Sequence, residues 1–226
     1  NPLTLTSVIA ATGNSATIYF KPDANWNGST DFTYNAVDNT GLSSTTPATG
    51  TISVTPVNDI PVALPTTGSG NEDTTIAISL HGSDVDGLVS SFKLATLPQN
   101  GKFYDANNVE LTTSSVIIAT ANGATIYFKP NLNWNGDTSF TYNSVDDQGL
   151  VSAAPATGTI KVDSVNDAPT AAAVNATTAE DTKVAITLTG ADVDGKVSSF
   201  KLTDLPAHGT FTDAAGNTLS TSSVIL

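Results

Sequence analysis

The chain of 226 residues contains no cysteine and no methionine. The absence of cysteine excludes a disulfide framework, thiolate metal sites and a cysteine nucleophile, and it leaves the redox compartment open. Because residue 1 is not methionine, we expect the chain to be part of a longer protein. The sequence also lacks a signal peptide and any apolar run near the roughly 18 residues that a membrane-spanning helix needs, so no membrane insertion is expected here.

Basic residues are scarce as well. Eight Lys and Arg residues stand against 21 Asp and Glu residues, which gives a formal net charge of −13. Such a surface repels a phosphate backbone, so nucleic acid is not expected as a partner. It suits divalent cations, or simple solubility. Charged residues are only 13% of the chain, but apolar positions recur regularly, and we therefore expect a folded protein.

What the sequence does contain is an internal repeat. The segment Thr-Ile-Tyr-Phe-Lys-Pro begins at Thr17 and again at Thr125, a stride of 108 residues. Val-Asn-Asp at 57–59 returns at 165–167, and Asp-Val-Asp-Gly at 84–87 returns at 192–195, with the same stride. No insertion breaks the register, and such a constant stride indicates tandem structural units.

The preferred boundary between units is the segment Val-Asn-Asp-x-Pro, at 57–61 and 165–169. Proline has no backbone N–H and biases the preceding residue toward extended geometry, which suits a short and stiff junction. This phasing gives the C-terminal half of one repeat (1–59), a complete repeat (60–167) and the N-terminal half of the next (168–226). Units near 1–108 and 109–216 are the alternative.

Short runs of alternating apolar residues cover the repeat. Period-two alternation predicts strands with one buried face, and Gly, Asn, Asp and Pro separate the runs. The inward residues are expected to be Ile76, Ile78 and Leu80, then Phe92 and Leu94, Ile126 and Phe128, Phe140 and Tyr142, and Ile160 and Val162. A hairpin turn is expected between 102–104 and 109–111. About seven or eight strands per repeat predict an all-β, antiparallel two-sheet sandwich, with a barrel as the alternative.

Acidic side chains are the only candidates for site chemistry. Asp84 and Asp86 lie two positions apart before a glycine, and Asp192 and Asp194 repeat them. Two carboxylates at this spacing in a loop can point at one ion, and calcium takes six to eight oxygen ligands. Asp-Gly is also ordinary turn chemistry, in which the carboxylate accepts local backbone N–H groups. The pattern is not an EF-hand loop, because Ala95 stands where the terminal glutamate would be needed.

Further acidic and amide residues recur around these loops. They are Glu72 and Asp73, Asp146 and Asp147, Asn58 and Asp59, and Asn166 and Asp167. Their order along the chain resembles the order of calcium ligands in cadherin repeats, although the acidic-Arg-Glu element of cadherins is missing.

The sequence is more similar to the bacterial cadherin-like, immunoglobulin-like tandem repeats (tandem-95-type) of large secreted repetitive adhesins. The motifs that carry this resemblance lie at 128–130, 134–136, 140–142, 165–169, 180–182 and 192–195. The resemblance covers nearly the whole chain. It implies an all-β fold of tandem immunoglobulin-like (cadherin-like) antiparallel β-sandwich repeats of 108 residues.

The same resemblance implies calcium at the junctions between repeats. One junction would gather Asn58, Asp59, Asp84, Asp86 and Asp146, and the other Glu72, Asn166, Asp167, Asp192 and Asp194. Like charges at a junction repel one another and let adjacent units bend, whereas a divalent ion neutralises them and stiffens the array.

An enzyme is not expected. His81 and His208 are the only histidines, neither recurs with the stride, and zinc or triad chemistry needs converging histidines with defined partners. Paired carboxylates could serve glycoside hydrolysis, but a site copied in every repeat without an aromatic groove suits that reaction poorly.

Three functions are compatible with these observations. The leading hypothesis is a structural extender module of a secreted bacterial surface adhesin or surface filament, whose partners are the neighbouring repeats. The second is a glycan- or cell-binding module. It would need an exposed aromatic patch, for which Trp26 and Trp134 are the only large candidates, and such a ligand could also bind elsewhere in the parent protein. The third is head-to-tail self-association, in which residues 168–226 of one copy complete residues 1–59 of another.

Overall fold

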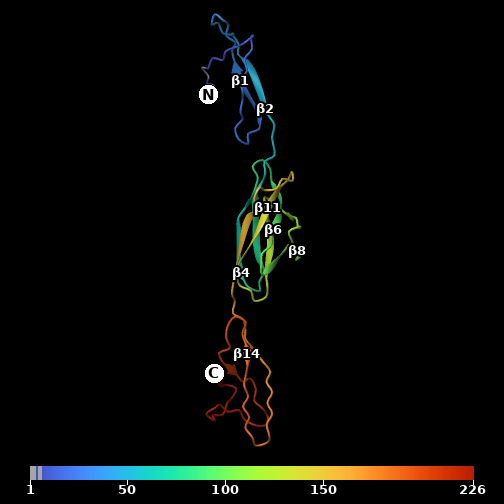
Figure 1. Cartoon of the computed structure of the whole chain (residues 1–226), viewed down its shortest axis with the longest axis vertical. Coiled ribbons are helices and arrows are strands. Elements are labelled where there is room, and N and C mark those ends of the chain that lie inside the picture. Colours follow the sequence, from blue (N-terminus) through green and yellow to red (C-terminus); the bar gives the residue numbers. More distant parts are fainter. Residues whose placement is uncertain (1–3, 5–6) are drawn as a thin grey trace.

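The computed structural model describes residue 4 and residues 7–226. Within this part of the chain the regular elements are all strands, so there is no helix that could cross a membrane. Three segments lie end to end along the long axis of the molecule (Figure 1). We call them the N-terminal segment (7–57), the central repeat (60–167) and the C-terminal segment (168–226), and the positions of the unit boundaries stay predictions.

The central repeat is a sandwich of two five-stranded sheets. The first sheet has the order β3-β5-β10-β7-β8, and all of its neighbouring strands are antiparallel. Its strands are β3 (Val62–Leu64), β5 (Ile76–Ser83), β10 (Gly123–Pro130), β7 (Gly101–Tyr104) and β8 (Glu110–Leu111).

The second sheet has the order β4-β12-β11-β6-β9. Its strands are β4 (Thr66–Asn71), β12 (Ala156–Asp163), β11 (Gly136–Asp146), β6 (Val89–Thr96) and β9 (Ile117–Ile118). The strand β4 pairs with β12 in parallel, so the sandwich is not antiparallel throughout. The strand β4 comes first along the chain in this sheet, and β12 comes last. Because the two run in the same direction, the chain enters the repeat at one end and leaves it at the other (Figure 1).

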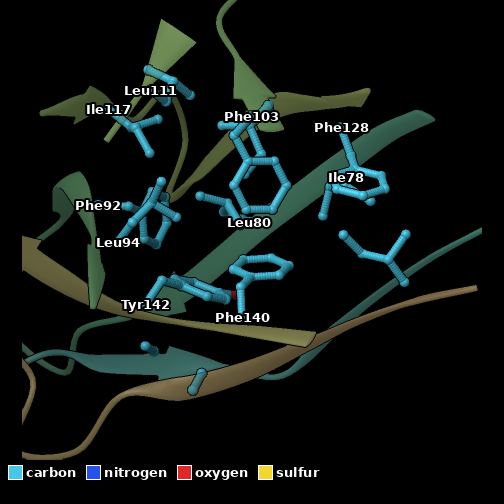
Figure 2. Close-up of a cluster of buried hydrophobic side chains, with 14 of the residues drawn as sticks. Ile78, Leu80, Phe92, Leu94, Phe103, Leu111, Ile117, Phe128, Phe140 and Tyr142 are labelled. Atoms are coloured by element: carbon cyan, nitrogen blue, oxygen red, sulfur yellow. The ribbon is translucent and has the colours of Figure 1, made fainter. Parts of the chain in front are cut away.

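The inward faces of the two sheets form one core. In Figure 2 the rings of Phe103 (β7) and Phe140 (β11) lie next to each other, and their centroids are 4.7 Å apart across the two sheets. The phenol of Tyr142 is buried, but its Oη donates to the carbonyl of Leu64 and accepts the N–H of His81 at 3.2 Å. Its polar group is therefore satisfied, as buried phenols require, and burial raises the pKa of Tyr142.

The strand predictions are confirmed in the central repeat. Every inward residue predicted from the alternation is less than 9% exposed. The predicted hairpin also forms, because β7 pairs with β8 antiparallel and Phe103 stands opposite Leu111. All-β architecture with two stacked sheets was therefore readable from the sequence.

The flanking segments contain only two-stranded pieces. These are β1 (Gly28–Tyr34) with β2 (Ala48–Val54), β13 (Thr170–Ala171) with β14 (Gly190–Ala191), and β15 (Phe200–Lys201) with β16 (Val224–Ile225). Among the residues that the structure describes, every buried one lies between Pro61 and Val162. The central repeat alone therefore has a closed core.

The core makes a first prediction about stability. Phe140 is 1% exposed and contacts aromatic rings on both sides, so Phe140→Ala should destabilise the central repeat by about 3–5 kcal/mol. Val116 is 56% exposed, and Val116→Ala should change stability by about 0.5 kcal/mol or less. Urea unfolding followed by circular dichroism measures both. Equal effects of the two substitutions would contradict this core.

Candidate functional site at the inter-repeat seams

Two junctions between segments carry the acidic residues that the sequence analysis singled out. We call the region around Asn58 and Asp59 the first seam, and the region around Asn166 and Asp167 the second seam. At the first seam the linker meets two loops of the central repeat, the turn 84–87 between β5 and β6 and the turn 146–150 at the end of β11.

Both polar atoms of the Asn58 side-chain amide make hydrogen bonds. Its Nδ2 donates to Oδ2 of Asp146 at 2.6 Å, and its Oδ1 accepts from Nε2 of Gln148 at 2.5 Å. These two bonds fasten the linker to the turn that follows β11. Gln148 was missed by the sequence analysis, since its counterpart one stride earlier is Thr40 and the repeat pattern gives no signal for it.

Asp146 is buried, with 1% of its surface exposed. Its Oδ1 accepts the backbone N–H groups of Gln148 at 2.9 Å and Leu150 at 2.7 Å. Burial works to raise the pKa of Asp146, but the bonds from Asn58, Leu150 and Gln148 outweigh it and leave the pKa below its ordinary value. The carboxylate is therefore charged at neutral pH and organises both the turn and the linker.

The turn of Asp146 also has a counterpart in the N-terminal segment. There Oδ1 of Asp38 accepts the N–H groups of Thr40 and Leu42, each at 2.8 Å. The carboxylate at this position thus has a local structural role wherever the turn occurs.

The carboxylates of Asp84 and Asp86 face the other side of the linker. The N–H of Asp59 donates to both carboxylate oxygens of Asp86, at 3.2 and 3.3 Å, and the N–H of Asp86 donates to Oδ1 of Asp84 at 3.3 Å. Oδ2 of Asp84 is buried and has no hydrogen-bond partner in the part of the chain that the structure describes. The turn therefore holds one carboxylate oxygen that is free to accept a ligand.

Gly87 shows how closely the two loops approach. A Cβ atom at this position would lie 2.9 Å from Oδ1 of Asp147 and 3.6 Å from Oδ2 of Asp84. A side chain at this position would push the Asp147 carboxylate aside, so the turn that contains Asp146 and Asp147 lies against the turn 84–87.

The second seam repeats the contact of the first. The N–H of Asp167 donates to the carboxylate of Asp194 at 3.3 and 3.4 Å, one stride after the contact of Asp59 with Asp86. Oδ2 of Asp167 is buried and, among the described residues, has no hydrogen-bond partner. Recurrence at both junctions indicates that the seam is part of the repeating design.

Negative charge gathers around Asp167. Burial raises the pKa of Asp167, and the carboxylates of Asp194, Asp73, Glu72 and Asp192 raise it further, in that order. The preceding repeat contributes two of these four groups and the C-terminal segment the other two. A cation at this place would be attracted by both partners of the junction.

Glu72 fastens the exit of the central repeat. It is 3% exposed, its Oε1 accepts the N–H of Val165 at 2.7 Å, and its Oε2 accepts from Nδ2 of Asn135 at 3.4 Å. Asn135 was not singled out as a seam residue, although its place in the repeated Asn-Trp-Asn-Gly motif was a usable signal. Asn166 does not join the carboxylates, because its Nδ2 donates to the carbonyl of Asp167 at 3.0 Å.

The predicted ligand sets are thus brought together in part. At the first seam Asn58 contacts Asp146, and Asp59 contacts Asp86, whose N–H bonds to Asp84; at the second seam Asp167 contacts Asp194. Glu72 bonds to the N–H of Val165 instead, and Asp192 accepts the N–H of Gly195 at 3.1 Å. Across the described residues 4 and 7–226, no three His, Cys, Asp or Glu side chains already converge as a metal site. The assignment of these residues to calcium stays a prediction.

The remaining candidates lie outside the seams. His81 and His208 are exposed and lie in different segments. Trp134 is partly buried and packs against the hydrophobic core, while Trp26 meets Phe20 edge to face with centroids 6.5 Å apart. Both tryptophans therefore take part in packing.

Asp146 gives a second prediction. Asp146→Asn keeps the shape of the side chain but removes its charge and one acceptor, so it should lower the urea midpoint of the central repeat at neutral pH. Because the folded pKa of Asp146 is lowered, its stabilisation is complete above the ordinary pKa of aspartate and is lost as pH falls through the lowered value. The difference in urea midpoint between the wild type and Asp146→Asn should therefore become smaller at acidic pH.

Asp38→Asn is the matched control, because it changes the same turn in a segment without a buried core. It should leave the unfolding of the central repeat unchanged. A gap for Asp146→Asn that widens as pH falls would refute the assigned role.

Comparison with curated proteins finds two relatives from one organism. Integrin beta-like protein E of Dictyostelium discoideum is 31% identical over 124 residues, which are 50% of this chain and 6% of that protein. Integrin beta-like protein C of the same organism is 24% identical over 239 residues, 96% of this chain and 12% of that protein. The chain therefore spans only a small part of the curated relatives that it matches.

Two solved bacterial structures are also matched. They are a conjugate transposon protein of Bacteroides vulgatus, with 12% identity, TM-score 0.32 and coverage of 45% of this chain and 82% of that chain, and a conjugative transposon lipoprotein of Bacteroides eggerthii, with 9% identity, TM-score 0.30 and coverage of 43% and 90%. Because both TM-scores are low, the fold assignment rests on strand pairing and on the family model.

Residues 58–163 match the family model described as "Bacterial Ig domain". The predicted immunoglobulin-like fold class is confirmed, whereas the narrower tandem-95-type assignment stays a prediction. Together with the pairing of its two sheets, this match makes the central repeat an immunoglobulin-like β-sandwich.

Proposed function

We propose that this chain is part of a non-catalytic, surface-exposed array of immunoglobulin-like repeats, which holds an adhesive region of its parent protein away from the cell, with calcium stiffening the seams. The observation that carries the proposal is the repetition of the seam itself. The bond between Asp59 and Asp86 recurs one stride later between Asp167 and Asp194. Each junction therefore fixes the next unit in the same way.

The course of the chain favours a spacer. Entry and exit lie at opposite ends of the central repeat, so successive units extend along one axis (Figure 1). Asn58 fastens the entry through Asp146, and Glu72 fastens the exit through the N–H of Val165. Fastened linkers of this kind give reach with limited bending, which is the property that a stalk needs.

Location at a cell surface is supported by the kind of proteins that this chain is similar to. The family model is a bacterial immunoglobulin-like domain, and the curated relatives are named integrin beta-like proteins. We extend this coarse similarity to a secreted or surface-attached adhesin, in which neighbouring repeats are the immediate partners.

Calcium fits the groups that the seams leave unsatisfied. Oδ2 of Asp84 and Oδ2 of Asp167 are buried without hydrogen-bond partners in the described chain, and hard carboxylate oxygens are the donors that calcium prefers. The first seam would use Asn58, Asp59, Asp84, Asp86 and Asp146, and the second Glu72, Asn166, Asp167, Asp192 and Asp194. When bound, the ion would supply positive charge that offsets the repulsion among these groups.

Small-angle scattering of the 226-residue chain tests the stiffening. Extracellular calcium modules bind at roughly 10⁻⁴ to 10⁻³ M, so the experiment compares millimolar calcium with chelator. In the presence of calcium the maximum dimension of the chain should be larger than in chelator, and the scattering curve should show less flexibility. Identical scattering curves would reject calcium stiffening and leave the spacer role to the hydrogen-bonded linkers.

A variant that neutralises one carboxylate distinguishes calcium binding at the seam from general attraction of cations to the acidic chain. Asp167→Asn removes the carboxylate on which both partners of the second seam converge, and calorimetric calcium affinity should fall about tenfold or more at that seam, as loss of one hard ligand predicts. Asp31→Asn makes the same charge change on an exposed residue of β1 and should leave the affinity unchanged. Equal losses in both variants would indicate nonspecific attraction.

A further inference from the structure

The last strand at each edge of a sheet presents main-chain N–H and C=O groups that can pair with another chain. The central repeat, all of which lies in the described part of the chain, has four such edge strands, β3 and β8 in one sheet and β4 and β9 in the other. We propose that β4 pairs with the β4 strand of a second copy of this chain and joins two arrays side by side. This proposal goes beyond the spacer role and does not depend on calcium.

Three of the four edges are protected against such pairing. The strand β3 has three residues between Pro61 and Pro65, and proline has no N–H to donate. The strands β8 and β9 have two residues each, and β8 also carries Glu110, which forms an ion pair with Lys102. Short strands, proline and charge are devices by which proteins keep sheet edges from pairing.

The strand β4 has none of these devices. Its six residues Thr66–Asn71 include no charged side chain and no proline, and no bulge interrupts its pairing with β12. One stride later, residues 174–179 differ from β4 at all six positions, yet they also contain neither charge nor proline. A neutral sequence at this edge is therefore a feature of the repeat.

The main-chain groups at the open edge follow from the hydrogen bonds of the strand. The N–H of Glu72 donates to the carbonyl of Asp163, which ends β12. Successive residues of a strand present their main-chain groups to opposite sides, so Thr67, Ser69 and Asn71 face away from β12. All three residues are exposed, which leaves this edge accessible to a second strand.

Thr67 and Ser69 set the register of an antiparallel pair. When Thr67 of one copy stands opposite Ser69 of the other, the two-fold axis passes through Gly68. The two residues then exchange main-chain hydrogen bonds in both directions, and the axis repeats the exchange on its other side. This contact would join the second sheets of the two copies into one continuous sheet.

The ends of β4 fit the same register. Asn71 would stand opposite Pro65 of the second copy, and the N–H of Asn71 could donate to the carbonyl of that proline. The carbonyl of Asn71 would meet no donor there, because proline has no N–H, but it already accepts from Oγ1 of Thr74 at 2.7 Å in its own copy. The edge is thus complementary to itself, which favours a second copy as its occupant.

Charge also favours β4 as the contact between copies. The chain has a net charge of −13, so most approaches of two copies bring like charges together. The strand β4 contributes no charge, and the neighbouring Glu72 is 3% exposed and bonded to the N–H of Val165. The remaining repulsion acts over a longer distance, and added salt should strengthen the pairing by screening it.

Sedimentation velocity of the 226-residue chain in chelator, over two decades of concentration up to the millimolar range, tests the proposal. The wild type should show a monomer–dimer equilibrium without larger species, because a two-fold contact closes on itself. Ser69→Pro removes an N–H from the open edge and should weaken dimerisation about tenfold or more, since each copy loses one main-chain bond. Ser69→Ala keeps that N–H and should dimerise like the wild type.

A second pair of variants leaves the main chain unchanged. Thr67→Asp places a carboxylate at the neutral edge, whereas Thr159→Asp makes the same charge change on the adjacent strand, at an exposed residue opposite Thr67. Thr67→Asp should weaken dimerisation more than Thr159→Asp does. The urea midpoint of the central repeat, measured in the same samples, should be similar in both, because both side chains are exposed.

Two outcomes would overturn the proposal. One is a wild type that stays monomeric at every concentration. The other is association that Ser69→Pro and Thr67→Asp leave unchanged, because the contact would then use another surface.

Cysteine pairing tests the register, because the chain contains no cysteine of its own. Chains with Thr67→Cys and chains with Ser69→Cys are mixed in equal amounts and oxidised mildly, and mass spectrometry separates mixed dimers from like pairs. Mixed disulfides should form at least about tenfold faster than either like pair, since residues 67 and 69 stand opposite each other at a spacing that a disulfide can bridge. Equal rates for all three pairs would refute this register.

Discussion

Parallel pairing of β4 with β12 places the entry and the exit of the chain at opposite ends of the central repeat. Along this pair Asn71 stands opposite Asp163, and the N–H of Glu72 donates to the carbonyl of Asp163 at 2.9 Å. The end of the early strand and the end of the last strand therefore lie at the same exit. Both the linear course of the chain and the position of Glu72 at the second seam follow from this constraint.

The seams combine two opposing interactions. The linkers are held by hydrogen bonds to two buried carboxylates, from Asn58 to Asp146 and from the N–H of Val165 to Glu72, which favours a fixed angle between units. The carboxylates around Asp167 repel one another and favour separation. Under the calcium binding that we propose, the positive charge would offset this repulsion while the hydrogen bonds of the linkers stay in place.

Much of the fold could be predicted because its inward residues alternate with polar ones in β5, β10, β11 and β12. The strand β4 could not, because its inward positions are Gly68 and Gly70 instead of apolar side chains. A Cβ atom at Gly68 would lie 2.0 Å from Cδ1 of Ile78, and one at Gly70 would lie 2.7 Å from Cγ1 of Ile76. Side chains of the facing sheet fill that space, so the strand carries no hydrophobic pattern.

The site was predictable to a similar extent. The stride itself placed Asp59 and Asp167 in equivalent positions, and the structure gives them equivalent partners. The hydrogen bond from Gln148 to Asn58 was not predictable. Gln148 does not recur with the stride, and a contact between polar side chains far apart in the sequence leaves no local pattern. The Nδ2 of Asn166 bonds to the backbone beside it, as short amide side chains in turns do, and the assignment of Asn166 as a ligand stays a prediction.

The central claim is that successive repeats continue along one axis with fastened junctions. Small-angle scattering of chains containing one, two and three complete repeats measures this most directly. The account predicts that the maximum dimension grows by the same increment, close to the length of one repeat, with each added unit. Growth that falls well short of linear, as for repeats that fold back or swing freely, would contradict it.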